Sequence, residues 1–223
     1  MSGPYKLDLR DVSRQRGVFI VFDGIDGAGK SALVAATAAC ARAAGLEVVS
    51  TVSPPREALQ RPLYLRYMLE PAARESIDYR GLIAVLMGER LQHAHELIGP
   101  SLTRGAAVLC DRYVFSAAAH FLARGFPDES WFVRLAAHLP RPTLAFHASA
   151  PLQVTRERVR TRSGHAESYL EEDFHARLHA AYETVCRSNG LIHVDTVTPV
   201  EETFSALRAR IETALSSSAR GTP

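Results

Sequence analysis

The strongest constraint on the fold is an apolar segment, VFIVFD at residues 18–23, that runs directly into the glycine-rich stretch GIDGAGKS at residues 24–31. A continuous apolar run of this length predicts a strand that is buried on both faces of a parallel sheet. The alanine-rich segment after Lys30 predicts a helix. A buried strand, a glycine-rich turn and a helix in this order begin a β-α-β unit, which indicates an α/β fold.

Four further apolar segments repeat this alternation and predict strands at 46–52, 106–111, 142–148 and 191–195. Helices are expected at 30–44, 77–102, 115–139 with an interruption near 125–127, 151–160, 170–189 and 199–216. Gly45, Gly105 and Gly190 lie where helix C-caps are needed before a strand. We therefore predict a three-layer α/β/α sandwich around a five-stranded parallel sheet with right-handed crossovers.

The 223 residues fit one compact α/β domain at 17–216, with a flexible extension at 1–16 and a flexible tail at 217–223. A formal charge of +2 gives no argument for nucleic acid or an anionic membrane as partner. No apolar run approaches the roughly 20 residues that span a bilayer. Three widely spaced cysteines fit neither a disulfide framework nor a zinc pattern, so the cytoplasm is the expected compartment.

The glycine-rich stretch matches the pattern G-x-x-x-x-G-K-[ST] of a P-loop, in which backbone N–H groups turn inward around a polyphosphate. In such a loop Lys30 would reach the β- and γ-phosphates, and the hydroxyl of Ser31 could bind Mg²⁺. Only two of the 26 basic residues, Lys6 and Lys30, are lysines. A lysine at the one position that needs it is therefore a strong sign of a phosphate site.

P-loop proteins differ in what they do with the nucleotide. A GTPase would need the guanine motif N-K-x-D, which this chain lacks. A kinase would need a second phosphate site, and Asp111-Arg112-Tyr113 ends the third predicted strand, at the edge of the sheet where such ligands bind. Residues 156–162 contain four arginines before a glycine-containing loop, which predicts a lid near 156–168.

Several motifs in a fixed order make the chain resemble the thymidylate kinases, a family of P-loop nucleoside monophosphate kinases. The motifs are FIVFDGIDGAGKS, LIAVLMGERLQH, DRYVFS, RPTLAFHASAP, TRERVRTR and EEDFHARLHAAYE, and they extend from residue 17 to residue 195. The resemblance implies a cytoplasmic homodimer that transfers the ATP γ-phosphoryl group to thymidine monophosphate with Mg²⁺. Its partner would be a small-molecule nucleotide, without nucleic acid or membrane.

The resemblance also implies roles for individual residues on the donor side. Lys30 and Ser31 would hold the ATP phosphates and Mg²⁺, with Asp111 close to the metal. One family subtype has its catalytic arginine inside the P-loop, so here the lid arginines Arg158 or Arg162 would have to supply it. The residues expected to bind ATP are Gly24, Asp26, Gly27, Ala28, Gly29, Lys30, Ser31 and Ala32.

On the acceptor side, the resemblance matches Arg112 to the arginine that binds the acceptor phosphate and Asp26 to an acid that faces the sugar hydroxyl. Arg56, in the sequence SPPR, matches an arginine that also touches the acceptor phosphate. Arg90, in the sequence MGER, matches an arginine that contacts the base. With Lys30, Arg112 and the two lid arginines would form the catalytic set.

Three acceptor positions depart from the family pattern. Leu86 replaces a phenylalanine that stacks on thymine, Ala117 replaces a serine or asparagine that hydrogen-bonds the base, and His120 replaces a tyrosine that disfavours a 2′-hydroxyl. Losing such groups removes discrimination between acceptors. Thymidine monophosphate, another non-standard nucleotide, and a phosphorylated or phosphonate metabolite of a specialised pathway all stay open as acceptors. A non-catalytic nucleotide-binding protein is a further alternative.

His175 and His179 are four residues apart on a predicted helix, a spacing that can bind a metal ion. The sequence supplies no third ligand next to them, which favours surface histidines instead.

Overall fold

The computed structural model describes residues 5–163 and 172–219 of the chain. Its centre is a sheet of five parallel strands in the order β2-β3-β1-β4-β5. The strands are β1 (Val18–Asp23), β2 (Val48–Val52), β3 (Ala107–Asp111), β4 (Leu144–Ser149) and β5 (Ile192–Asp195). Each of them coincides with one of the apolar segments expected to form strands, so the predicted fold class is confirmed.

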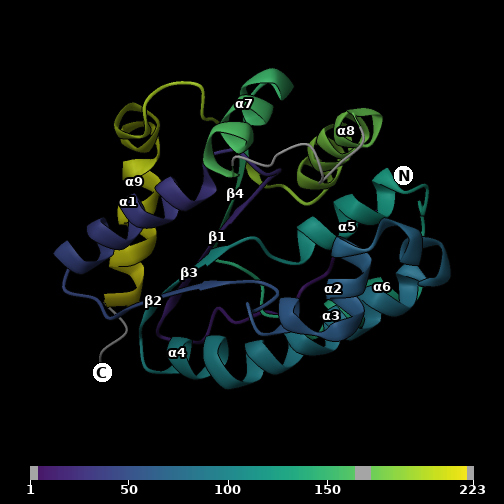
Figure 1. The fold of residues 1–223 in the computed structure, drawn as a ribbon. Helices are drawn as coiled ribbons and strands as arrows, with labels where there is room; N and C mark the ends of the chain where they lie inside the picture. The colour runs from purple at the N-terminus through teal and green to yellow at the C-terminus, as the bar shows by residue number, and fades with distance from the viewer. Residues whose placement is uncertain (1–4, 164–171, 220–223) are drawn as a thin grey trace.

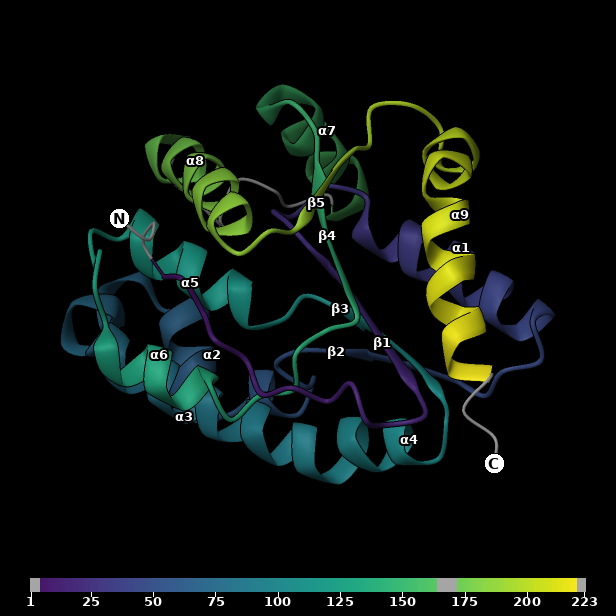
Figure 2. The same ribbon diagram turned by 180° about the vertical axis from the view of Figure 1, so that it is seen from behind.

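The helices of this part of the chain are α1 (Lys30–Ala43), α2 (Pro62–Leu69), α3 (Tyr79–His93), α4 (Gly99–Thr103), α5 (Val114–Ala123), α6 (Ser130–Ala136), α7 (Leu152–Ser163), α8 (Glu172–Ser188) and α9 (Val200–Ala219). Helices α1 and α9 lie together on one face of the sheet, while α3, α5 and α8 lie on the other (Figures 1 and 2). Within the described ranges, no helix combines the length and apolarity needed to cross a membrane.

The glycines expected to cap helices adopt the backbone conformation that this role requires. The φ angles of Gly45, Gly105 and Gly190 are 78°, 90° and 71°, in the left-handed region that side chains disfavour. Each of them precedes one of the parallel strands. The C-terminal breaks of these helices could therefore be read from the glycine pattern alone.

The helix expected at 77–102 is continuous in space but is not a single α-helix. A π-helical turn, Ala94–Ile98, separates α3 from α4. Pro100 has no N–H to donate, so an undisturbed α-helical ladder cannot pass through it. The N–H of Gly99 instead donates to the carbonyl oxygen of Ala94, five residues earlier.

Residues 53–76, for which the apolar pattern predicts no element, contain α2 and two short 3₁₀ turns, Ala58–Gln60 and Pro71–Ser76. None of the residues of α2 is fully buried, although Leu63, Tyr64 and Tyr67 pack partly buried against the core. Its eight residues are too few for a repeating apolar pattern to identify a helix. Arg61, just before α2, forms an ion pair with Glu89 of α3 at 2.7 Å. This pair and Pro62 at the helix start fix the segment beside α3.

The start of the chain, expected as a flexible extension, packs against the domain from residue 5 onward. Tyr5, Leu7 and Leu9 are buried, and the hydroxyl of Tyr5 donates to the carbonyl of Phe126. The side chain of Asn189 accepts from the N–H of Leu7 at 2.8 Å and donates to the carbonyl of Tyr5 at 2.9 Å. At the other end, α9 extends to residue 219, and residues 220–223 lie outside the described part.

A buried carboxylate at the end of β1 connects the central strand to α5. Oδ1 of Asp23 accepts hydrogen bonds from the N–H of Gly24 at 2.9 Å and the hydroxyl of Ser116 at 2.6 Å. Oδ2 accepts from the N–H groups of Tyr113 and Ser116, at 2.9 and 3.2 Å. Tyr113 makes no side-chain cap for α5. Asp23 therefore caps this helix from another strand.

We predict that Asp23→Ala lowers the free energy of unfolding by roughly 3 kcal/mol, because four buried donor groups lose their acceptor. Urea unfolding at neutral pH would measure the change. Asp8→Ala is the matched control, since Asp8 is exposed and pairs only with the exposed Arg141, and we expect little change from it. Equal stabilities of the two variants would contradict the capping role.

Candidate active site

The loop between β1 and α1 has glycine where the backbone or its neighbours exclude a side chain. Gly27 has a φ angle of 81°, and a Cβ atom there would lie 2.2 Å from the carbonyl oxygen of Thr155. At Gly24 a Cβ atom would lie 2.3 Å from the carbonyl oxygen of Ala148. Gly29, with a φ angle of 80°, leads into α1. The loop is therefore closely packed and ends at a helix N-terminus, as phosphate binding requires.

Lys30 is buried at the first position of α1, and its ammonium group donates to the carbonyl oxygen of Ile25 at 2.8 Å. Burial, assisted by the nearby Arg112, lowers the pKa of Lys30 to about 8, while Asp26, Asp111 and Asp23 oppose this shift. The loop therefore holds a lysine whose charge is poorly compensated. An anionic ligand in the loop would supply the missing negative charge.

Ser31 and Asp111 bring two oxygen atoms together at the carboxyl end of the sheet. The hydroxyl of Ser31 donates to Oδ2 of Asp111 at 2.7 Å. Both side chains retain access to solvent. A hydroxyl oxygen and a carboxylate oxygen this close are suitable ligands for Mg²⁺, directly or through water. The two residues fit the expected metal position.

Arg112 is held by three contacts, two of them to the glycine-rich loop and one to α8. One guanidinium nitrogen donates to the carbonyl of Gly24 at 3.0 Å and to the hydroxyl of Tyr182 at 2.9 Å. The other pairs with the carboxylate of Asp26. This pairing, together with Lys30, lowers the pKa of Asp26 against the effect of burial. The predicted acceptor arginine and the predicted phosphate loop are thus in direct contact.

The backbone of Arg112 is unusual, because its φ angle of 67° places a non-glycine residue in the left-handed region. Its N–H is held by the carbonyl of Phe22 at 2.8 Å. The conformation turns the chain sharply after β3 and directs the guanidinium toward the loop. A conformation of this kind costs on the order of 1 kcal/mol and is typical of functional positions.

Of the lid arginines, Arg158 contacts the loop. Its guanidinium donates to the carbonyl of Gly27 at 3.4 Å and to that of Thr196 at 2.7 Å. Arg160 faces solvent and pairs with Glu157 at 2.6 Å, while Arg156 donates to Nδ1 of His175 at 3.2 Å. The side chain of Arg162, the other proposed catalytic arginine, lies outside the described part, as do lid residues 164–168.

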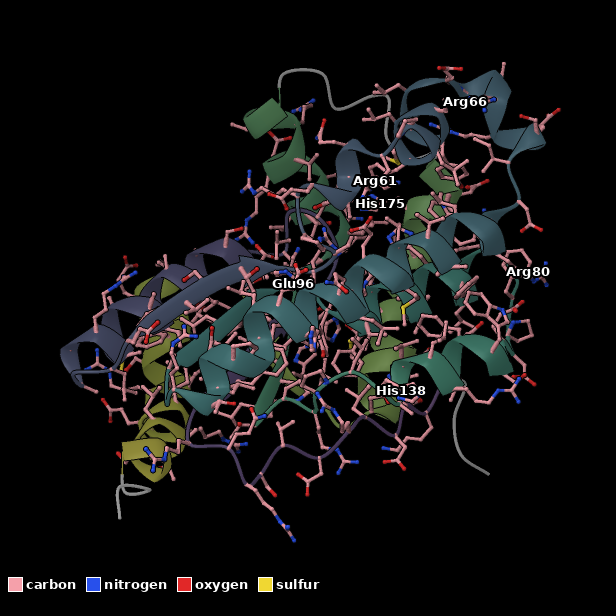
Figure 3. All side chains as sticks on the ribbon, turned by 90° about the horizontal axis from the view of Figure 1, so that it is seen from below. Arg61, Arg66, Arg80, Glu96, His138 and His175 are labelled. Atoms are coloured by element: carbon pink, nitrogen blue, oxygen red, sulfur yellow. The ribbon has the colours of Figure 1, made fainter. Side chains whose placement is uncertain are left out.

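A cavity of about 530 Å³ opens beside Arg112, between the sheet, α3, α5 and α8. Four of the predicted acceptor residues line it together with Asp26 and Arg112: Leu86, Arg90, Ala117 and His120. Arg56 is exposed and is absent from the lining. Arg66 and Arg80 likewise project from the surface (Figure 3). A larger cavity of about 770 Å³ lies between α1 and α9 and contains none of the predicted residues.

Arg90 is buried in the wall of the cavity without a carboxylate partner among the described residues. One of its terminal nitrogens donates to the carbonyl of Leu86 at 3.4 Å, and its Nε has no hydrogen-bond partner. Burial lowers its pKa to about 10, against the influence of Asp23. A buried N–H without a partner is costly, and a ligand with an acceptor oxygen would satisfy it.

His120 is held neutral in the cavity by its surroundings. Burial and then Arg124 lower its pKa to about 3. Nδ1 of His120 lies 3.0 Å from a guanidinium nitrogen of Arg124, so this ring nitrogen must accept. The same guanidinium lies 4.3 Å from the ring centres of both Tyr79 and Phe174. His120 therefore carries its proton on Nε2 and can donate from that atom.

Several residues of this site were missed from the sequence. Tyr182 lies within the matched motif EEDFHARLHAAYE but carried no assigned role. Tyr67 lines the cavity from the segment without a predicted element, and Tyr79 lines it from the start of the helix predicted at 77–102, also without an assigned role. Asp23 could have been found, because a charged residue ends an otherwise apolar strand. No sequence signal identifies Thr196, whose contact with Arg158 depends on the tertiary fold.

A family model described as thymidylate kinase matches residues 22–207. A probable thymidylate kinase of Pyrococcus horikoshii is 34% identical over 149 residues, covering 66% of this chain and 72% of the relative. The thymidylate kinase of Desulfotalea psychrophila is 30% identical over 161 residues, covering 72% and 77%. That of Akkermansia muciniphila is 29% identical over 202 residues, covering 91% and 93%.

The depressed pKa of Lys30 predicts a pH-dependent affinity for ATP. A phosphate anion needs the charged lysine, so we expect the affinity to fall about tenfold per pH unit above about pH 8. Titration calorimetry from pH 7 to pH 9.5 would measure this slope. Lys30→Arg is the control, because arginine stays protonated throughout. This variant should bind ATP more weakly, with an affinity that does not change with pH. A flat profile for the original protein would contradict the assignment.

The same shift predicts the sign of one contribution to stability. Because Lys30 has a lower pKa in the folded chain, the unfolded chain binds more protons between pH 8 and about 10.5. The penalty for the buried charge is therefore present below pH 8 and is relieved as the pH rises. In the absence of nucleotide, the free energy of unfolding of the original protein should therefore rise between pH 8 and about 10.5 relative to that of Lys30→Arg.

Proposed function

The chain belongs to the thymidylate kinase family of ATP-dependent nucleoside monophosphate kinases, and from this we propose that its acceptor is thymidine monophosphate, selected less strictly than in the family pattern. The observation that carries the proposal is the contact between the glycine-rich loop and Arg112. It positions a cradle for donor phosphates beside a guanidinium that can bind an acceptor phosphate in bidentate fashion. Two phosphate sites this close support direct transfer between them.

We assign Lys30 to the phosphates of ATP and Arg112 to the phosphate of the acceptor. Asp26 pairs with Arg112, so an acceptor phosphate bound by Arg112 would displace or share this carboxylate. Once Arg112 has turned toward the acceptor, Asp26 is available to accept a hydrogen bond from the sugar. No general base is needed, because the attacking phosphate oxygen is already an anion.

Ser31 and Asp111 would hold Mg²⁺, since they supply a hydroxyl and a carboxylate oxygen beside the loop. When bound, the ion would neutralise charge on the donor phosphates. Arg158 would add positive charge from the lid, because the partners it has among the described residues are carbonyl oxygens. Both assignments depend on electrostatic stabilisation of the transferred group, which is the main requirement of this reaction.

Weaker selection of the acceptor follows from the groups that line the cavity. Ala117 offers the base no hydrogen bond. His120 leaves more room than the family's tyrosine, and its Nε2–H can donate to a hydroxyl of the sugar. Arg90 lines the cavity, and its guanidinium can donate to an oxygen of the base. We therefore propose that the base is held mainly by Arg90 and that a 2′-hydroxyl is tolerated.

A second candidate acceptor is favoured by the charge of the cavity. Among its described lining residues are Arg74, Arg90, Arg112, Arg124 and Arg177, against Asp26 as the one acid. Arg74 and Arg177 donate only to backbone carbonyls in the described hydrogen bonds. A nucleotide or phosphorylated metabolite with a further anionic group at the end remote from its phosphate would complement these charges.

We further propose a cytoplasmic homodimer, and we retain residues 17–216 as one catalytic unit with a lid near 156–168. The three cysteines are free, which agrees with a reducing compartment. The exposed side of α3 carries Gly81, Ala84, Val85 and Gly88. This surface is apolar and lacks bulky side chains, so two copies of the helix could approach closely there.

The proposal predicts ADP release with thymidine monophosphate and with its ribose analogue, at values of kcat/KM that differ by less than about 100-fold. A coupled assay over a panel of nucleoside monophosphates would measure this. His120→Tyr should increase the preference for the deoxy form about tenfold or more, and Lys30→Ala should abolish ADP release. If no nucleoside monophosphate supports ADP release while ATP still binds, the second candidate, an acceptor with a further anionic group, would be favoured.

Arg158 and Arg160 offer a matched pair for the lid assignment, since they lie two residues apart on α7 and differ in their contacts. Arg158→Ala should lower kcat about 100-fold or more with little change in the KM of the acceptor. Arg160→Ala should leave both constants nearly unchanged. Similar kinetics for the two variants would argue against a role of Arg158 in the transfer.

A further inference from the structure

Outside the proposed kinase site, three potential metal ligands meet at the edge of the sheet. His147 of β4 and His193 of β5 are paired in register on neighbouring parallel strands, so their side chains leave the same face of the sheet. Glu183 of α8 approaches both of them. Its Oε1 atom lies 4.0 Å from Nδ1 of His147 and 3.9 Å from Nε2 of His193.

All three ligand atoms lie within 4.8 Å of one another. In a tetrahedral zinc site, with bonds of about 2.0–2.2 Å, two ligand atoms are roughly 3.4 Å apart. The distances from Glu183 to the histidines exceed this value by about 0.5 Å. Binding of an ion would therefore require small changes in the side-chain torsions that bring the three ligand atoms together.

The surroundings fix two of the ligands and leave the third open. The hydroxyl of Ser149 donates to the same Glu183 oxygen at 2.9 Å, as residues behind a metal ligand commonly do. The ring of Tyr182 stacks on His147 with centres 6.3 Å apart. The side chain of His147 is 5% exposed and that of His193 is 57% exposed. An ion could therefore enter from the side of His193 and keep water as a further ligand.

We propose that His147, Glu183 and His193 form a site for a divalent transition-metal ion such as Zn²⁺ or Co²⁺. Two imidazoles and one carboxylate are a ligand set that these ions favour and that Mg²⁺ does not. The site is separate from the proposed Mg²⁺ position at Ser31 and Asp111. A bound ion would attach α8 to the edge of the sheet at Glu183. The preceding residue, Tyr182, accepts a hydrogen bond from Arg112 through its hydroxyl.

The pair with the expected metal spacing, His175 and His179, does not form this site. His175 accepts from Arg156, and Nε2 of His179 lies 3.1 Å from the carbonyl oxygen of Ala150. Glu183 follows His179 by four residues and so lies on the same side of α8. The proposed site thus combines Glu183 of this helix with two histidines from separate strands.

Binding of Co²⁺ to the full chain, freed of any affinity tag, would test the site. We expect one Co²⁺ per chain, with the intense visible d–d bands of a low-symmetry four- or five-coordinate ion, and competition by Zn²⁺. His193→Gln and Glu183→Gln should weaken binding at least about tenfold. Because His193 is largely exposed, its substitution should leave the metal-free melting temperature unchanged, which confirms folding.

His138→Gln is the matched control, since His138 lies on the exposed turn after α6, labelled in Figure 3, and its Co²⁺ binding should equal that of the original protein. The absence of Co²⁺ binding by the original protein would overturn the proposal and leave only packing contacts between Glu183 and the two histidines. Equal binding by all variants would also overturn it. An intense thiolate-to-cobalt band would do the same, because it would assign the ion to a cysteine such as Cys186.

Discussion

The carboxylate of Asp23 is the interaction on which the arrangement of the site depends. It receives the first N–H of the glycine-rich loop through one oxygen and the start of α5 through both. The donor side and the acceptor side of the site are therefore attached to the same two oxygen atoms. Since reacting groups must be held within a few tenths of an ångström, a shared rigid anchor is more effective than two independent ones.

Around this anchor, the site is organised by positive charge that the protein itself leaves incompletely balanced. Lys30 and Arg90 are buried with depressed pKa values, and Arg158 contacts carbonyl oxygens only in the described hydrogen bonds. Such groups reduce the stability of the folded chain, and polyanionic ligands would supply the partners they lack. The same residues would therefore lower the free energy of unfolding and contribute to the binding of anionic ligands.

The sequence was informative wherever local chemistry dictates geometry, and less so where distant segments meet. The apolar segments, the glycines with positive φ and the loop around Lys30 identify the sheet, the helix ends and the phosphate cradle. The segment at 53–76 was missed because the eight residues of α2 are too short for a periodic apolar pattern, and with it Tyr67, which lines the cavity. The link from Tyr182 to Arg112 joins residues 70 positions apart, and no periodicity reports such a contact.

Arg112 has a backbone conformation that glycine would adopt at a lower energetic cost. The role proposed for its guanidinium and its backbone conformation therefore favour different residues: glycine would relieve the strain but would remove the contact proposed for the acceptor phosphate. Evolution cannot improve both at once, which is a trade-off between stability and activity confined to one residue. In any descendant released from catalysis, this position should be among the first to drift, so its residue type reports whether a related chain is still under selection as an enzyme.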